Sequence, residues 1–323
     1  MKAIRIHEFG LSEDVLKYEE VPVPEPSSGE VGIKVEAASL NRADLGLRKG
    51  TYRISPDALP VIPGREFAGT IAKLGASVTE FTIGQRVVGY PSLGGYAEYA
   101  VAKTAEVRPI PDGVTFAQAA ALPTASLTAW FGLLTDGNLK SAEWLLIQGG
   151  SSGVGVAAIQ IAKHLGAKVI ATSGSEVKCR RLRTLGADVT IDVSENDFVA
   201  EVMRVTNNRG VDVVLEMIGG EVYQKSLPLL APGGRLFSIG GAFGAVPDPP
   251  PALTDGRKAT RFSITNYLKA KPEEFQQLDI ILKLVQEKKL DPGIGKTFPL
   301  AETAAAQRYL EGREHFGKVM LTM

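Results

Sequence analysis

Apolar residues in the first hundred positions come in short runs, separated by turns that are rich in glycine and proline. The runs cover residues 3–6, 31–37, 69–74, 86–90 and 96–101. Stretches of this length with turn residues on both sides are typical of β-strands. The pattern predicts a compact, barrel-like β domain in this part of the chain.

From residue 116 the pattern changes to helices that alternate with apolar strands. An alanine-rich helical segment covers 116–134, and strands are predicted at 144–147, 168–171, 189–191, 211–216 and 235–239. This alternation predicts an α/β fold with a parallel sheet, whose ligands bind at the carboxyl ends of the strands. Ile218 and Gly240 follow two of these ends and are therefore candidate cofactor contacts.

The last eighty residues begin with a stretch that is too rich in proline for a helix or an inner strand. Prolines stand at 247, 249, 250 and 251, and we expect a loop there, a candidate lid. A helix is predicted over 272–288. After Pro299 a short helix leads to a last strand at 317–321.

A glycine-dense turn joins the strand at 144–147 to the next helix. Gly149, Gly150, Gly153 and Gly155 let the backbone bend tightly, so that a phosphate can approach the amides that open the helix. The dinucleotide-binding fingerprint is matched imperfectly, because Ser152 stands where its middle glycine is expected. The candidate contacts are Gly150, Ser151, Ser152, Gly153, Val154 and Gly155.

Two other interpretations of this turn remain. Residues 149–153 also fit the G-x-S-x-G elbow of serine hydrolases, which needs a histidine. Only His164 and His315 follow, and His164 falls on the helix that the turn opens. The turn could also be a plain connection without a ligand, although its glycines cost backbone entropy that such a connection need not spend.

The residues after the next strand favour NADPH over NADH. An NAD site places a carboxylate near this point for the ribose hydroxyl, but residues 172–175 are Thr-Ser-Gly-Ser and the first acid is Glu176. Ser173, Ser175 and Lys178 offer hydroxyls and a cation that suit a 2′-phosphate. The alternative for Lys178 is a solvated helix face.

Composition excludes several classes of partner. Lys plus Arg and Asp plus Glu both number 36, so there is no electrostatic case for nucleic-acid or membrane binding, while neutrality permits self-association. No apolar run approaches the length of a membrane span, and the N-terminus lacks an apolar signal region. A single cysteine, Cys179, excludes an internal disulfide and fits a reducing cytoplasm.

The ordered motifs along the chain resemble the medium-chain dehydrogenase/reductase superfamily, and within it the zinc-independent NADPH:quinone oxidoreductases. The motifs are Leu40-Asn-Arg-Ala-Asp44, Pro63-Gly-Arg-Glu-Phe-Ala-Gly69, Gly94-Gly-Tyr-Ala-Glu-Tyr99, Ala119-Ala-Ala-Leu-Pro123, Leu127-Thr-Ala129 and the glycine turn. The resemblance implies a GroES-like domain formed by 1–118 and 289–323, a Rossmann domain at 119–288, an active site in the cleft and a homodimer. It also implies that Thr128 and Lys318 contact the cofactor.

The chain departs from the zinc enzymes of that superfamily. Leu40-Asn41 has no cysteine, the Gly-His-Glu triplet is Gly64-Arg65-Glu66, and the four clustered cysteines of a structural zinc site are missing. One cysteine and three scattered histidines cannot assemble a tetrahedral zinc site, so we expect no metal. Val193 also departs, because some relatives place a tyrosine in this region near the adenosine phosphate.

The expected chemistry is hydride transfer from the nicotinamide to a quinone, or to the β-carbon of an enone, an enal or an enoyl thioester. Asn41 and Tyr52, which the resemblance puts at the substrate, can donate hydrogen bonds to the developing oxyanion, and Asp44 is expected to orient this loop. The structural alternatives are a turn cap for Asn41, a helix cap for Asp44 and packing for Tyr52. A non-catalytic NADPH-gated binding protein is the other class considered, and the neutral charge argues against RNA as its ligand.

Overall fold

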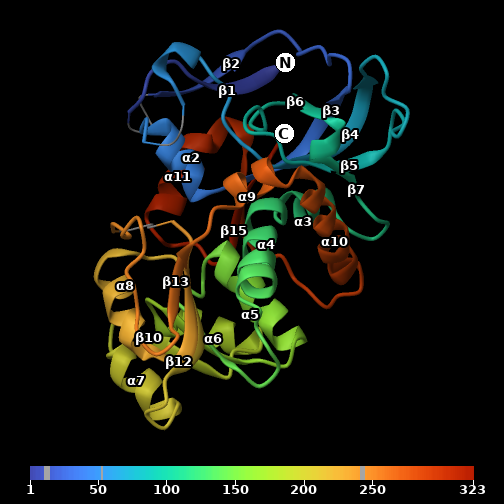
Figure 1. The fold of residues 1–323 in the computed structure, drawn as a ribbon. Coiled ribbons are helices and arrows are strands. Elements are labelled where there is room, and N and C mark those ends of the chain that lie inside the picture. Colours follow the sequence, from blue (N-terminus) through green and yellow to red (C-terminus); the bar gives the residue numbers. More distant parts are fainter. Residues whose placement is uncertain (11–14, 52–53, 241–243) are drawn as a thin grey trace. The chain divides into compact units, whose positions relative to one another are not determined.

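The computed structural model describes residues 1–10, 15–51, 54–240 and 244–323 (Figure 1). Contacts divide the chain into two compact units, one of residues 1–124 and 272–323 and the other of residues 125–271. The domain boundaries expected from the sequence, after residues 118 and 288, stay a prediction. The units are described separately below.

The first unit is built on a seven-stranded sheet. Its strand order is β14-β15-β3-β4-β5-β7, with β6 also paired to β3, and β1 and β2 form a separate antiparallel pair. The strands are β1 (Lys2–Ile6), β2 (Leu16–Glu20), β3 (Glu30–Leu40), β4 (Phe67–Leu74), β5 (Arg86–Gly89), β6 (Tyr99–Lys103), β7 (Val107–Pro109), β14 (Ile294–Pro299) and β15 (Lys318–Thr322). The predicted β-rich domain is therefore confirmed, and both ends of the chain contribute to it.

The last strand of the chain pairs with one of the first. β15 runs antiparallel to β3 with Val319 opposite Leu40, so Lys318 comes next to the residues that end β3. The helices of this unit are α2 (Arg42–Arg48), α3 (Phe116–Ala120), α10 (Leu278–Gln286) and α11 (Thr303–Glu311). β2, β7 and β14 were not predicted from the sequence.

The second unit contains a six-stranded sheet in which every neighbouring pair is parallel. Its order is β10-β9-β8-β11-β12-β13. Starting from β8, the chain adds β9 and β10 on one side of the sheet and β11, β12 and β13 on the other, as in doubly wound dinucleotide-binding sheets. The strands are β8 (Trp144–Ile147), β9 (Lys168–Ser173), β10 (Val189–Asp192), β11 (Val211–Glu216), β12 (Leu230–Ser238) and β13 (Lys258–Arg261). The predicted α/β class is confirmed.

Four helices connect these strands, α5 (Gly153–His164), α6 (Glu176–Thr184), α7 (Phe198–Val205) and α8 (Gly220–Ser226), and α9 (Ile264–Ala270) follows the last strand. Residues 145–147, at the centre of the sheet, are completely buried, as expected for a parallel strand that is covered on both faces.

Two predicted helices are wrong in detail. The segment 116–134 is interrupted after α3, continues as α4 (Pro123–Trp130) and ends in a π-helix, Phe131–Asp136. The segment 272–288 begins with a 3₁₀ helix, Pro272–Gln277, before α10. Residues 244–257, all of them described, contain neither helix nor strand, which confirms the loop predicted around the prolines.

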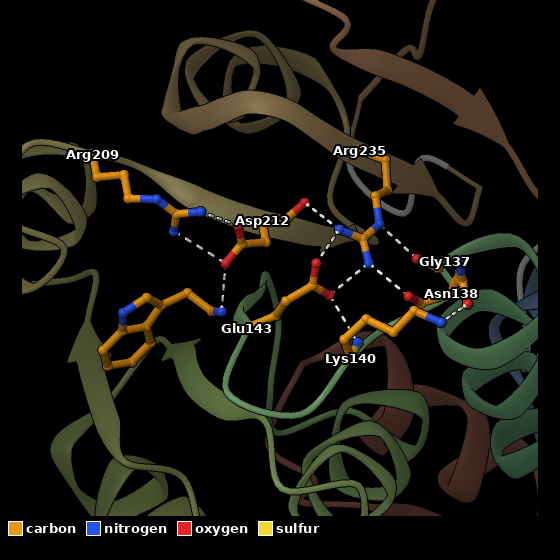
Figure 2. Close-up of polar contacts among 8 residues, drawn as sticks. Gly137, Asn138, Lys140, Glu143, Arg209, Asp212 and Arg235 are labelled. Carbon is orange, nitrogen blue, oxygen red and sulfur yellow. Dashed lines mark hydrogen bonds and ion pairs between the residues drawn. The ribbon is translucent and has the colours of Figure 1, made fainter.

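A network of charged groups joins the amino ends of the central strands of the second unit (Figure 2). Arg235 of β12 bonds through Nε to the carbonyl of Gly137, and through its two terminal nitrogens to both oxygens of Glu143 and to the carbonyls of Asn138 and Asp212. A guanidinium has five N–H donors, and all five are used here. Arg235 thus ties the end of the π-helix to β8, β11 and β12.

No helix among the described residues combines the length and the apolar character that a membrane crossing needs.

Candidate functional site

The glycine turn of the second unit lies between β8 and α5 and is held against the end of β9. The amides of Gly149 and Gly150 donate to the Oγ1 and the carbonyl oxygen of Thr172, at 3.1 and 2.8 Å. Ser152 is the N-cap of α5, and its Oγ accepts the amide of Gly155 at 3.1 Å. The first amides of a helix have no acceptor within the helix, so those of Gly153 and Val154 are suited to bind a phosphate.

Close packing explains why this turn needs glycine. A Cβ on Gly155 would lie 2.5 Å from the carbonyl oxygen of Gly150, and a Cβ on Gly150 would lie 3.0 Å from the Cβ of Ala171. Gly149 has a φ of +80°, a conformation that side chains disfavour. The turn can therefore bring its backbone close to a ligand that a bulkier sequence would keep away.

The geometry of α5 argues against the hydrolase alternative. His164 is the last residue of this 12-residue helix, which Ser152 caps at the other end. At 1.5 Å per residue the two are about 18 Å apart along the helix, and the serine of the elbow, Ser151, comes just before this cap, so a base at His164 is too far away to reach it. His315 belongs to the other unit.

The carboxyl end of β9 carries a buried hydroxyl that has no partner among the described residues. Ser173 is 4% exposed, and its Oγ makes no hydrogen bond to the described part of the chain. Ser175 is the N-cap of α6 and accepts the amide of Lys178 at 3.4 Å, so Lys178 lies in the first turn of the helix. The carboxylate of Glu176 is engaged by Arg183. The arrangement offers an anion a hydroxyl and a cation beside a helix N-terminus.

The next strand ends beside Ser173. The amide of Val193 donates to the Ser173 carbonyl at 2.9 Å, and Val193 is 44% exposed. The position where some relatives carry a tyrosine is therefore adjacent to the proposed phosphate contacts, but its side chain here is aliphatic and cannot donate a hydrogen bond.

The turn after β11 is organised by a buried carboxylate that the sequence did not single out. Glu216 accepts the amides of Ile218 and Gly219 at 2.6 and 2.9 Å, and burial raises its pKa above the ordinary value. Ile218 packs against the glycine turn, with its Cδ1 3.1 Å from the position of a Cβ on Gly149. Gly240, after β12, is exposed with a φ of +73°.

In the first unit, Asn41 and Asp44 lie at the start of α2. Asn41 is the N-cap and Asp44 is the third helical residue, whose Oδ2 accepts the Asn41 amide at 2.7 Å and the Tyr96 hydroxyl at 2.7 Å. Burial raises the pKa of Asp44, and the hydrogen bond from Tyr96 and the charge of Arg65 offset this only in part. These contacts support an orienting role for Asp44.

Asn41 also belongs to a buried cluster around Glu66 and Lys318. Glu66 Oε1 accepts from Asn41 Nδ2 at 2.8 Å and from Lys318 Nζ at 2.7 Å, and also from the Ser39 hydroxyl. Its other oxygen accepts the amide of Thr124 at 2.6 Å. Burial alone would raise the pKa of Glu66, but the charge and hydrogen bond of Lys318 outweigh it, so this pKa lies below its ordinary value.

The remaining candidate residues lie in different surroundings. Thr128 is on α4 and is 1% exposed. Tyr52 lies outside the described residues. Thr124 was missed by the sequence reasoning, and its Oγ1 is buried without a partner in the part of the chain that the structure describes.

No three His, Cys, Asp or Glu side chains among the described residues are grouped so that they could hold a metal ion. The expectation that the protein lacks a metal stays a prediction.

Comparison with known proteins gives matches along the whole chain. The family model of the alcohol dehydrogenase GroES-like domain matches residues 27–112, and that of the zinc-binding dehydrogenase matches residues 153–283. The quinone oxidoreductase of Sus scrofa is 34% identical over 326 residues, which cover all of this chain and 98% of that protein.

Solved structures agree with this. A mycobacterial protein in complex with NADPH is 32% identical, with a TM-score of 0.91 and complete coverage of both chains. The CurK enoyl reductase is 30% identical, with a TM-score of 0.90 over all of this chain and 99% of that one.

Proposed function

Because this chain belongs to the quinone oxidoreductase family of the medium-chain dehydrogenase/reductase superfamily, we propose that it is an NADPH-dependent reductase that transfers hydride to a quinone. The observation that carries the proposal is the carboxyl end of β9, where the buried hydroxyl of Ser173 has no partner among the described residues and Lys178 lies in the first turn of the helix that follows. The mycobacterial relative solved with NADPH supports the same cofactor.

Three groups of residues in the second unit are proposed to bind the pyrophosphate, the 2′-phosphate and the nicotinamide half of NADPH. Within the turn at 150–155, the amides of Gly153 and Val154 would hold the pyrophosphate, and Ser173, Ser175 and Lys178 would hold the 2′-phosphate. Ile218, Gly240 and Thr128 are proposed to line the nicotinamide half. When bound, the cofactor supplies the hydride, and the protein provides orientation and electrostatic stabilisation.

Residues of the first unit are proposed to act on the acceptor. Asn41 donates from its amide to the oxygen that gains negative charge, and Tyr52 is proposed as a second donor. Asp44 holds the Asn41 backbone. Lys318 was predicted to contact the cofactor, but its three donors already serve Leu40, Asn41 and Glu66, so we assign it another role below.

Replacing Asn41 or Tyr52 tests this assignment. A single oxyanion donor is worth about 3 kcal/mol in acyl transfer, and quinone reduction demands less, so Asn41→Ala and Tyr52→Phe should each lower turnover roughly tenfold. The dissociation constant of NADPH, measured by fluorescence titration, should stay within about twofold of wild type. Unchanged turnover in both variants would refute the assignment of the two donors.

An enoyl or enone reductase is the second candidate, because the CurK enoyl reductase is similar over the whole chain. NADPH oxidation should be measured with benzoquinone, naphthoquinone, a 2-alkenal, crotonyl-CoA and a simple aldehyde. Quinones as the best acceptors would support the first proposal, and crotonyl-CoA or the alkenal would support the second. RNA retention in a filter-binding assay without NADPH oxidation would favour a binding protein instead.

The family also leads us to propose a homodimer in the cytoplasm, with the GroES-like and Rossmann domain limits expected from the sequence. Light scattering after size exclusion measures the mass against the 34.4 kDa of one chain.

A further inference from the structure

Glu66 and Lys318 form an ion pair that is almost completely removed from solvent. Glu66 is 0% and Lys318 is 4% exposed, and Nζ lies 2.7 Å from Oε1. Buried charges are costly unless their hydrogen-bonding capacity is satisfied. The Lys318 ammonium donates to the Leu40 carbonyl at 3.0 Å, to Asn41 Oδ1 at 2.7 Å and to Glu66. All three donors of this lysine are therefore used within the protein.

The pair fixes the orientation of the Asn41 carboxamide. Its oxygen accepts from Lys318 and its nitrogen donates to Glu66. An ammonium cannot accept a hydrogen bond and a carboxylate cannot donate one, so the opposite amide orientation would lose both bonds. The nitrogen carries two N–H groups, and Glu66 accepts one of them. The second N–H is the one that a ligand can use.

Lys318 also strengthens that N–H as a donor. A cation at the amide oxygen draws electron density from the nitrogen, and hydrogen bonds that share a group polarise one another in a dry site. We propose that Glu66 and Lys318 are positioning residues, which hold Asn41 so that its second N–H meets the oxygen of the acceptor. This inference rests on the proposed function and specifies how its principal donor is oriented.

The test is a mutant cycle on turnover. Removing one partner would leave a buried unpaired charge, whereas replacing both by apolar residues of similar volume is tolerated more often. Glu66→Met/Lys318→Met should therefore fold and should lower kcat roughly tenfold, as Asn41→Ala does, with the NADPH dissociation constant within about twofold of wild type. When the same two substitutions are added to Asn41→Ala, kcat should not fall further.

Two results would overturn the inference. Losses that multiply in the triple variant would show that the pair does not act through Asn41. A weaker NADPH affinity with unchanged kcat would make Lys318 a cofactor ligand. The exposed pair Glu221 and Lys225, whose charges are 2.8 Å apart on α8, is the matched control, and its double methionine variant should behave as wild type.

A second variant and a second readout cover a failure to fold. Lys318→Arg keeps the charge, but a planar guanidinium cannot reproduce the three diverging bonds, so kcat should fall. In a protein that already carries Asn41→Ala, Lys318→Arg should lower kcat no further. In wild type, the Asn41 Nδ2 proton that Glu66 accepts should exchange slowly with solvent in ¹⁵N spectra, and Lys318→Arg should speed this exchange. An unchanged exchange rate would contradict the positioning role. Failure to oxidise NADPH with any of the acceptors tested would refute the proposed function, while the spectra would still test the orientation of Asn41.

Discussion

Ser173 gives an unusually sharp test because its hydroxyl is buried without a partner among the described residues. An unsatisfied buried hydroxyl costs about 1 kcal/mol or more, and a hydrogen bond to a charged group contributes about 1.5 to 3 kcal/mol. Ser173→Ala should leave the free energy of unfolding of the free protein unchanged or slightly higher. It should weaken NADPH binding roughly tenfold. Urea unfolding and cofactor titration measure the two effects, and a destabilised variant with normal affinity would contradict this prediction.

Lys178 should decide between the two nicotinamide cofactors. It lies in the first turn of α6, where the helix dipole also favours an anion. Lys178→Ala should raise the dissociation constant of NADPH roughly tenfold, because partial solvent exposure keeps the loss near the lower end for a charged hydrogen bond. The constant for NADH, which lacks the 2′-phosphate, should barely change.

The control for Lys178 is Lys225→Ala, which removes a lysine from another helix of the same unit. An equal loss for both cofactors in Lys178→Ala would mean that this residue supports the fold or the shared part of the cofactor. A wild-type protein that prefers NADH would overturn the interpretation of residues 172–178.

Contacts were predictable from the sequence where the partners are close in the chain. Asp44 and Asn41 are three residues apart, and their hydrogen bond fits both the loop-orienting role and the helix-cap alternative for Asp44, so the role stays a prediction. Lys318 and Glu66 are 252 positions apart, and only the pairing of β15 with β3 brings them together. No local pattern carries that information, so the sequence assigned Lys318 to the cofactor.

At the level of helices and strands, the pattern of apolar residues correctly predicted the elements that are rich in buried apolar side chains. The strands β8 and β11 lie where the pattern predicts them, because buried parallel strands are continuous apolar runs. β13 was missed, since Lys258–Arg261 has only one partly buried apolar residue in an otherwise polar edge strand. The break after α3 was missed because alanine favours helix throughout the segment.

The Arg235 network should be a main support of the second unit (Figure 2). The Arg235 and Glu143 side chains are 18% and 23% exposed, and Arg235→Met would leave several part-buried acceptors without donors. We expect a loss of about 2 kcal/mol in the free energy of unfolding. Arg209→Met, which removes a 56% exposed arginine from the same network, should cost less than about 1 kcal/mol. Equal losses in urea titrations would contradict a special role for Arg235.

The same network predicts a pH dependence of stability. Burial alone would raise the pKa of Glu143, but its hydrogen bonds from Arg235 and from the Lys140 amide outweigh this, so the pKa lies below its ordinary value of 4.5. A carboxylate with a lowered pKa stabilises the folded state above its unfolded-state pKa, and this contribution is lost as the pH falls. As the pH falls below about 4.5, wild type should therefore lose more stability than Glu143→Gln.

Glu195→Gln, at an exposed acid of the same unit, is the control for this comparison and should follow wild type. If the free energy of unfolding depends on pH in the same way for wild type and Glu143→Gln, titration of the Glu143 carboxylate does not contribute to stability in this range.

Over the whole molecule, the order of strands supports the interpretation of a modest motif as a nucleotide site. The sheet order reverses beside β8, so the crevice at its carboxyl end is where doubly wound sheets bind ligands. The glycine turn lies at this point, although Ser152 breaks the fingerprint. Sequence alone could place the turn after a strand, but it could not show the neighbouring ends of β9 and β11 that complete the site.

The inventory of metal ligands along the chain leads to the last prediction. A tetrahedral zinc site needs several Cys and His ligands, and this chain has one cysteine and three histidines. His7 is bound to Glu19 at 2.7 Å, and Cys179 is buried on α6 of the second unit. The Lys318 ammonium lies 2.7 Å from Glu66, where a second cation would be repelled. Although the family model that matches residues 153–283 is that of a zinc-binding dehydrogenase, elemental analysis of the pure protein should find no stoichiometric zinc. Dialysis against 1,10-phenanthroline should leave NADPH oxidation intact, whereas one tightly held zinc per chain, with activity lost on its removal and restored by its return, would overturn the prediction.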